Sequence, residues 1–133
     1  MKRLLIILGV LTSQVIHAQI FVSTDARTVY NWDSIGEEWI LEESEDDFLT
    51  FFEFNNELTM IKHTTPSVTS AYLIKSVEVD DEDGRDQIEY DVISDVGNSY
   101  MLLYDAKNEN IRFIDFKSDR MIRFEIKAVW TEE

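Results

Sequence analysis

Apolar and polar residues alternate along the C-terminal part of the chain, and this alternation constrains the fold more than any other feature. In the segment 120–130, charged side chains such as Arg123, Glu125 and Lys127 stand between residues that are apolar at every second position: Ile122, Phe124, Ile126, Ala128 and Trp130. A period of two is that of a β-strand with one buried face and one solvated face. We therefore predict a strand here, with its five apolar side chains directed into a core.

Similar patterns recur through the rest of the chain. In the segment 87–94, Ile88, Tyr90 and Val92 fall on one side, and Glu89 and Asp91 on the other. Segments rich in β-branched and aromatic residues are typical strands, and we predict seven more of them: 27–32, 38–43, 48–54, 58–64, 70–79, 99–105 and 110–117. The phenylalanines of the segment 48–54 point to both sides, which predicts a strand that is covered on both faces or lines a cavity.

Short polar segments separate the predicted strands. They are rich in Asn, Asp and Gly, which tolerate the positive φ angles of tight hairpins, and they comprise residues 55–57, 83–84, 96–98, 107–110 and 118–119. Because they are too short for crossover helices, consecutive strands should pair antiparallel. The sequence predicts an all-β fold, an antiparallel up-and-down meander of about eight or nine strands. The meander would form a closed or partly open barrel, which removes exposed edges, or alternatively a β-sandwich.

The N-terminus has the pattern of a signal peptide. Lys2 and Arg3 precede an apolar run, residues 4–11, which is too short to span a bilayer, and Ala18 supplies a small residue for cleavage. A membrane anchor or a buried strand are the alternatives. We predict a signal peptide at residues 1–18 and a single all-β domain at residues 19–133, exported to the periplasm or outside the cell.

The chain has no cysteine, and this absence limits its chemistry. It excludes a lipid-modified N-terminal cysteine, a thiol nucleophile and a disulfide scaffold. A domain of the remaining length buries roughly two-thirds of its unfolded surface, so it needs neither disulfides nor a metal to fold. No segment after residue 18 approaches membrane-spanning length, and we expect no integral membrane segment after signal removal.

The charge of the chain is strongly negative. Its formal net charge is −15, and loss of the two basic residues Lys2 and Arg3 would change this to −17. Such a surface repels nucleic acid and anionic membranes, so we expect no nucleic-acid partner. It attracts cations or a basic protein, although solubility alone also explains it.

Catalytic patterns are missing. After signal removal His63 is the one histidine, and no Gly-x-Ser-x-Gly motif accompanies it, so we interpret it as an ordinary strand-end histidine. The acidic runs 37–38, 42–43 and 45–47 could supply an acid and a base, but their predicted turns would leave them solvated. We predict that the protein is not an enzyme and uses no cofactor.

One acidic segment, residues 80–86, gathers the oxygen ligands that calcium prefers. Placing Gly84 at the sixth position of an EF-hand loop puts Val79 at the first and Tyr90 at the twelfth, so that motif fails. A solvated hairpin turn is the leading interpretation. Weak calcium binding is the alternative, with ligands from Asp81, Asp83 and Asp86.

Two segments resemble the start of lipocalin-like (calycin) proteins: 36–41, which reads Gly-Glu-Glu-Trp-Ile-Leu, and 52–60. In that family an early Gly-x-Trp strand leads into a meander, and this chain has Gly-x-x-Trp. The resemblance covers about the first third of the chain after residue 18. It implies a small antiparallel barrel that can hold an apolar ligand, with Trp39 closing one end.

Aromatic side chains supply the candidate ligand-binding residues, although most rings in a small β-domain belong to its core. The candidates are Tyr30, Trp32, Trp39, Phe52 and Phe54. We expect a non-enzymatic binding domain that meets an unknown protein through an acidic face. The alternative is a lipocalin-like carrier of a small apolar ligand. A carrier needs a lined cavity, whereas an interaction module has a filled core and an exposed patch.

Overall fold

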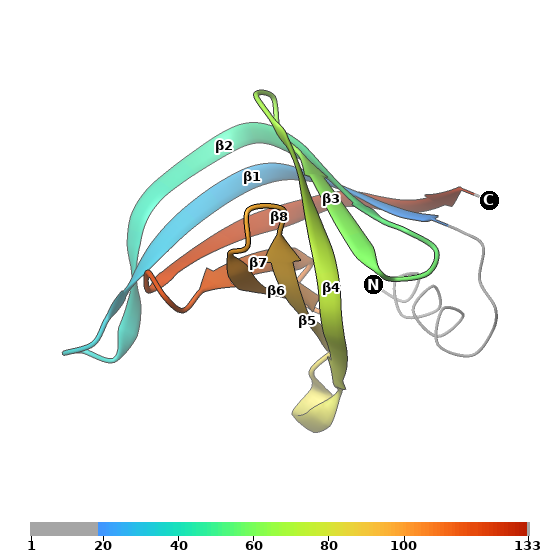
Figure 1. Ribbon diagram of the computed structural model, residues 1–133. Helices are drawn as coiled ribbons and strands as arrows, with labels where there is room; N and C mark the ends of the chain where they lie inside the picture. Colours follow the sequence, from blue (N-terminus) through green and yellow to red (C-terminus); the bar gives the residue numbers. More distant parts are fainter. Residues whose placement is uncertain (1–18, 133) are drawn as a thin grey trace.

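The computed structural model describes residues 19–132, and within this range the chain forms a closed barrel of eight antiparallel strands in chain order (Figure 1). The strands are β1 (Gln19–Asp33), β2 (Glu38–Phe54), β3 (Met60–Thr64), β4 (Thr69–Asp80), β5 (Gln87–Ser94), β6 (Ser99–Asp105), β7 (Asn110–Asp115) and β8 (Arg120–Glu132), and one 3₁₀ turn, η1 (Glu82–Gly84), joins β4 to β5. The predicted all-β meander is confirmed, and the barrel is closed. The predicted signal peptide, residues 1–18, lies outside the described residues.

Closure comes from pairing between the first and last strands. β1 pairs with β2 along one edge and with β8 along the other, and Gln19 is in register with Glu132. This eight-stranded architecture is compatible with the calycin-like fold that the resemblance implies. Among residues 19–132, no helix is long and apolar enough to cross a membrane.

Alternate side chains from the strands fill the barrel with a single apolar cluster. It includes Phe52 and Phe54 from β2, and further members are Val22, Ile61, Tyr90, Val92, Leu102, Tyr104, Ile111 and Phe124. Phe52 is fully buried and packs against Phe113 and Phe124, with ring centroids 5.9 and 5.4 Å away. Burial of one such side chain contributes roughly 1.5–3 kcal/mol to folding.

Phe51 corrects the prediction for its strand. Its side chain is 41% exposed, whereas those of Phe52 and Phe54 are buried. The strand is therefore covered on one face, and the ordinary period of two places Phe51 on the other.

β8 departs from the predicted alternation near its end. Ile122, Phe124 and Ile126 pack in or against the core as predicted. Thr24 of β1 is in register with Ile126 and Ser23 with Ala128, so an extra residue in β8 makes a bulge there. A bulge reverses the inward and outward sides of the residues that follow. As a result Val129 packs against the core, and Trp130, predicted to face inward, stacks on Phe21 with centroids 5.6 Å apart.

The segments 38–43 and 48–54, predicted as two strands, belong to the single strand β2. The acidic residues between them, predicted as a turn, pair with β1, and Arg27 forms an ion pair with Glu43 at 3.5 Å. Asp47, with φ at 58°, lies where the register between β1 and β2 shifts. This irregularity lets two long strands bend while they stay paired. The first strand was likewise underestimated, since β1 starts at Gln19 and not at residue 27.

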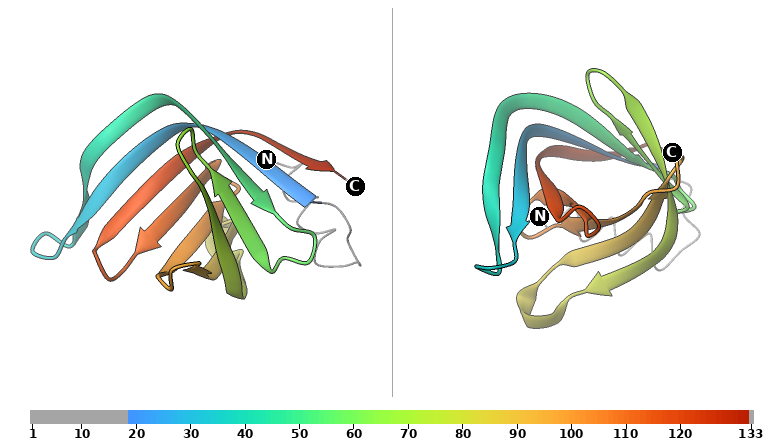
Figure 2. Two further views of the ribbon diagram at one scale, coloured as in Figure 1. Left: turned by 45° about the horizontal axis from the view of Figure 1, so that its top comes forward. Right: turned by 60° about the vertical axis from the view of Figure 1, so that its left-hand side comes forward.

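Residues 30–41 of β1, β2 and their turn form a hairpin arm, whose Tyr30 and Asn31 still pair with β8 and whose tip extends beyond the other strands (Figure 2). In the left-hand view of Figure 2 the tip of this arm projects past the β7–β8 turn. Ile35 at the tip is 94% exposed, and Leu41 is 59% exposed. The arm thus carries exposed apolar side chains among acidic ones.

The up-and-down order gives the barrel two ends of different chemistry. The turns at 65–68, 95–98 and 116–119 lie at one end, and those at 55–59, 81–86 and 106–109 lie at the other. Gly97 and Asp119 adopt positive φ values of 88° and 55°, as predicted for tight hairpins. A pocket lies at the first end, and a polar network lies on the outer face of the sheet near the second.

Candidate functional site

A pocket of about 230 Å³ lies where the β7–β8 turn meets strands β3, β4 and β6. Its deepest residues are buried aromatic ones, Phe113 and Phe124, with exposed fractions of 8% and 3%. Ile122 adds an aliphatic surface beside them. The base of the pocket is therefore apolar and belongs to the wall of the barrel core.

His63 forms one side of the pocket and is held by a stack of rings. Its imidazole lies parallel to Phe52 at a centroid distance of 4.1 Å, with Phe124 edge-on at 5.0 Å. Its Nε2 lies 3.1 Å from the hydroxyl oxygen of Thr50, which is 2.6 Å from that of Thr24. Position 63 was predicted to be an ordinary strand-end residue, but its side chain is buried in the barrel.

Burial determines the charge of this imidazole. It lowers the pKa of His63 from 6.5 to about 4, because the charged form loses its hydration inside the barrel. His63 is therefore neutral at pH 7. One ring nitrogen carries a proton and the other is an acceptor, so the ring presents an uncharged polar edge in an aromatic wall.

Two tyrosines form the upper wall of the pocket. Tyr72 of β4 and Tyr100 of β6 meet edge to face at 5.9 Å, and both pack on Phe113, at 5.1 and 6.1 Å. Burial raises the pKa of Tyr72 above its ordinary value of 10. Its hydroxyl therefore stays protonated at neutral pH and can donate a hydrogen bond.

The mouth of the pocket is polar and lies around the β7–β8 turn. Asp115, Ser118 and Arg120 line it, and Ser118 and Arg120 are exposed. Asp115 Oδ1 accepts hydrogen bonds from the backbone N–H groups of Lys117 and Ser118, at 3.1 and 3.3 Å. The pocket thus combines an aromatic base, a neutral imidazole and a charged mouth, which is the usual pattern of a small-molecule site.

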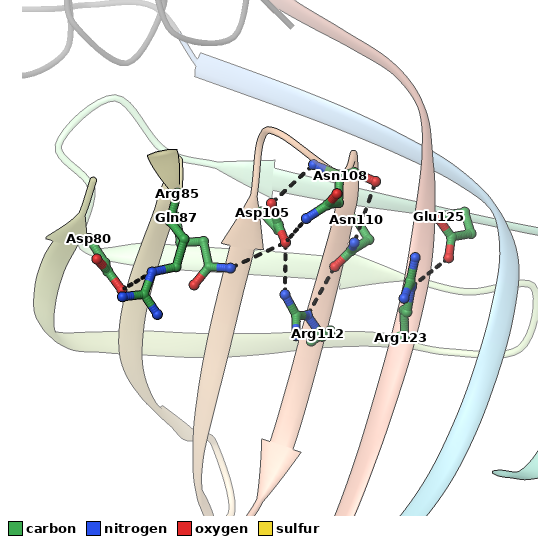
Figure 3. A network of polar contacts seen from close by, with 9 residues as sticks. All are labelled: Asp80, Arg85, Gln87, Asp105, Asn108, Asn110, Arg112, Arg123 and Glu125. Atoms are coloured by element: carbon green, nitrogen blue, oxygen red, sulfur yellow. Dashed lines mark hydrogen bonds and ion pairs between the residues drawn. The ribbon is translucent and has the colours of Figure 1, made fainter. Parts of the chain in front are cut away.

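A polar network around Asp105 lies on the outward face of strands β5, β6 and β7, near the opposite end of the barrel (Figure 3). This carboxylate accepts hydrogen bonds from Arg112 Nη2 at 2.8 Å, from Gln87 Nε2 at 3.3 Å, and from the Asn108 side-chain and backbone nitrogens at 2.9 and 3.1 Å. Burial alone would raise the pKa of Asp105, but the bonds from Asn108 and the charge of Arg112 hold it below its ordinary value. The carboxylate has its partners within the protein, so we interpret it as structural.

The five predicted ligand-binding residues lie outside the lining of this pocket. Phe52 supports it from behind through His63, and Phe54 packs deeper in the core against Tyr90, at 5.5 Å. Tyr30, Trp32 and Trp39 lie on the hairpin arm.

The resemblance implied that Trp39 closes one end of the barrel. Its ring instead lies edge-on against Trp32 at 5.3 Å, where β1 and β2 extend beyond the other strands. Trp39 is only partly buried and is not part of the core cluster.

The predicted calcium ligands are not brought together. Among residues 19–132, no group of three or more His, Asp or Glu side chains is placed to hold a metal ion. The turn that carries Asp81, Asp83 and Asp86 instead brings in Arg85, which lies 3.6 Å from Asp80 and 3.7 Å from Asp83. Arg85 offsets part of the negative charge of this turn.

The pocket is not evident in the sequence, where its residues carry only weak signals. His63 was interpreted only as an ordinary strand-end histidine, and Tyr100 and Arg120 only belonged to the predicted strands 99–105 and 120–130. Tyr72 carried no signal beyond its place in a strand. Because the lining comes from five strands and one turn, only the pairing of those strands reveals it.

The geometry defines the class of the protein as an eight-stranded up-and-down barrel with a pocket at one end. Comparison with known protein families, curated proteins and solved structures gives no significant match. The function is therefore argued from the pocket.

Proposed function

We propose that this protein is an exported, non-enzymatic binding domain that holds a small planar apolar group in the pocket at the end of its barrel. The observation that carries the proposal is the pocket itself, an open space of about 230 Å³ lined by Tyr72, Tyr100, Phe113 and Phe124. A cluster of buried apolar side chains lies beside it in the barrel. An aromatic pocket beside a well-packed core is the arrangement that suits a ligand ring.

The volume limits the size of the ligand. A protein cavity of about 150 Å³ accepts benzene, and sites for drug-sized molecules span roughly 300–1,000 Å³. The pocket here lies between these values. It suits one ring with a short substituent, and a long-chain lipid is too large for it.

The pocket supports binding better than catalysis. His63, the histidine of the site, has its hydrogen-bonding nitrogen directed at Thr50, a buried residue in contact with Thr24. Asp115 uses one carboxylate oxygen to hold the turn. These contacts stabilise the wall of a pocket, whereas a general base needs a reacting group within reach.

A titration with neutral ring compounds tests this proposal. Indole added to ¹⁵N-labelled protein should shift the amide signals of β7, β8 and their turn, with a Kd of about 1 mM or tighter for a ligand of this size. The variant Ser118→Trp should weaken binding, because a large side chain at the mouth covers the opening. Ser44→Trp places the same side chain at an exposed position of β2 and should leave binding unchanged.

Two results would contradict the proposal. One is that indole leaves the pocket amides unshifted at saturating concentration. The other is that Ser118→Trp and Ser44→Trp bind indole equally well. Shifts confined to the hairpin arm would instead favour the alternative of a protein contact through an acidic face.

Export is the second part of the proposal and is supported by the N-terminal sequence pattern. β1 begins at Gln19, directly after the expected cleavage site, so cleavage would leave the barrel intact. Expression of the full chain in a Gram-negative host should yield a periplasmic protein whose N-terminal residue is Gln19, by sequencing and intact mass. A cytoplasmic product that keeps residues 1–18 would contradict export.

A further inference from the structure

Arg120 at the mouth of the pocket is the one arginine among residues 19–132 without a carboxylate partner. The other four each lie within ion-pairing distance of an acid, in the pairs Arg27–Glu43, Arg85–Asp80, Arg112–Asp105 and Arg123–Glu125. The chain carries 27 acidic residues against 12 basic ones, so carboxylates are abundant. An arginine left unpaired in such a chain has its guanidinium available to a ligand.

Asp115 is the acid best placed to pair with Arg120, because the two residues are in register across β7 and β8. No ion pair joins them, although both line the pocket. The carboxylate is instead drawn toward the turn by the N–H groups of Lys117 and Ser118. The lining of the pocket therefore includes both an unpaired guanidinium and an aromatic base.

We infer that the ligand carries a carboxylate next to its ring, and that Arg120 recognises this group. This inference rests on the proposed function and specifies the chemistry of the same pocket. A guanidinium offers two parallel N–H donors that match the two oxygens of a carboxylate. The ring would lie on Phe113 and Phe124, while the acidic surface disfavours anions that lack such an anchor.

The inner polar groups agree with a ligand that is polar at one end only. His63 is neutral, and Tyr72 keeps its hydroxyl proton, so neither brings a charge to the base of the pocket. The charged side chains, Asp115 and Arg120, both lie in or beside the β7–β8 turn. A charged group deeper in the pocket would have no partner of opposite sign.

Three probes with one ring and one chain length test the inference: 3-phenylpropionate, its amide, and 3-phenylpropylamine. Binding is measured by the same amide shifts in the wild-type protein. The carboxylate should bind about tenfold more tightly than the amide, the expected value of a charged hydrogen-bonded contact at a partly exposed site. The amine should bind most weakly.

Variants then assign the preference to a residue. Arg120→Gln should bind the carboxylate and the amide equally. Arg123→Gln, on the same strand but paired with Glu125 and outside the pocket, should keep the tenfold preference. Asp115→Asn retains an oxygen for the turn and removes a negative charge from the mouth, so the carboxylate should bind at least as tightly as to wild type.

The carboxylate could belong to a free aromatic acid or to the last residue of a polypeptide. The tripeptide Gly-Gly-Phe and its C-terminal amide separate these sources. Tighter binding of the free tripeptide than of its amide supports a polypeptide end. Failure of both tripeptides, with 3-phenylpropionate still bound, supports a free acid.

Different failures separate the inference from the proposed function. Equal binding of the carboxylate and the amide, an unchanged preference in Arg120→Gln, or tightest binding of the amine overturns the inference and leaves the pocket as a ring-binding site. If none of the three probes nor indole shifts the pocket amides, the proposed function fails as well.

Discussion

Replacing Asp105 with alanine should destabilise the barrel by about 3 kcal/mol, although this residue lies at the end opposite the pocket. Its side chain is 1% exposed and accepts hydrogen bonds from Arg112, Gln87 and Asn108. Removal of one partner of a buried ion pair typically costs about 3–5 kcal/mol. The lower value applies because Arg112 is 24% exposed and can be rehydrated in part. Urea unfolding at neutral pH measures the loss, which corresponds to a fall in Tm of roughly 10–15 °C.

Glu125→Gln is the matched control for this prediction. It weakens the Arg123–Glu125 pair, which lies on the neighbouring strand (Figure 3), and both side chains of that pair are more than a third exposed. Exposed pairs contribute about 1 kcal/mol or less, so this variant should remain close to wild type. If Asp105→Ala costs no more than Glu125→Gln, the hydrogen bonds of Asp105 do not stabilise the barrel.

The strand pattern predicted the fold well because the period of two is a local property. Ile88, Tyr90 and Val92 are buried as predicted, and the strands 87–94 and 99–105 have the predicted bounds. The short turns with Gly97 and Asp119 fixed the antiparallel order. Closure was left open by the sequence, since it depends on pairing between β1 and β8 at opposite ends of the chain.

The predictions failed where strands bend or pair irregularly. The bulge in β8 moved Trp130 to the face opposite Val129, and the irregular pairing near Asp47 joined two predicted strands into one. Such features follow from the register of the neighbouring strand. Alternation within a single strand therefore cannot reveal them.

The outward face of the sheet is less exposed to solvent than the alternation of single strands predicts. Leu103, Ile114 and Met121 are 6–8% exposed, yet none of them belongs to the core cluster. Ile114 is in register with Met101 on one side and with Met121 on the other. Cross-strand neighbours of this kind shield one another, a property of the assembled sheet.

The pocket could not be predicted for the same reason. His63 and Arg120 are 57 positions apart in the sequence and come together only through strand order and register. Their chemical properties also depend on the fold. His63 is neutral because it is buried, and Arg120 is available because Asp115 is engaged by the turn.

The burial of His63 leads to the second large effect, a loss of stability in mild acid. At about pH 7 the imidazole is neutral in both the folded and the unfolded chain. As the pH falls through 6.5, the unfolded chain takes up a proton that the folded protein does not accept until about pH 4. Stability is therefore lost over this range, by about 3 kcal/mol in total. Unfolding by urea, followed at several pH values from about 7 to 4, measures the slope.

His63→Phe and His63→Gln test whether this residue causes the loss. Phenylalanine keeps a ring against Phe52, and glutamine keeps a polar group that can reach Thr50, so the two variants differ in stability at neutral pH. Neither titrates, and both should lose about 3 kcal/mol less than wild type between pH 7 and pH 4. Asp105 does not affect this comparison, because all three proteins contain it. Its pKa is lowered from 3.8, so the stability that it contributes is lost mainly below the pH range in which His63 acts. The prediction is contradicted if all three proteins lose stability with the same slope. His63 would then take up its proton as readily in the folded barrel as in the unfolded chain, and the neutral imidazole assigned to the pocket wall would be incorrect.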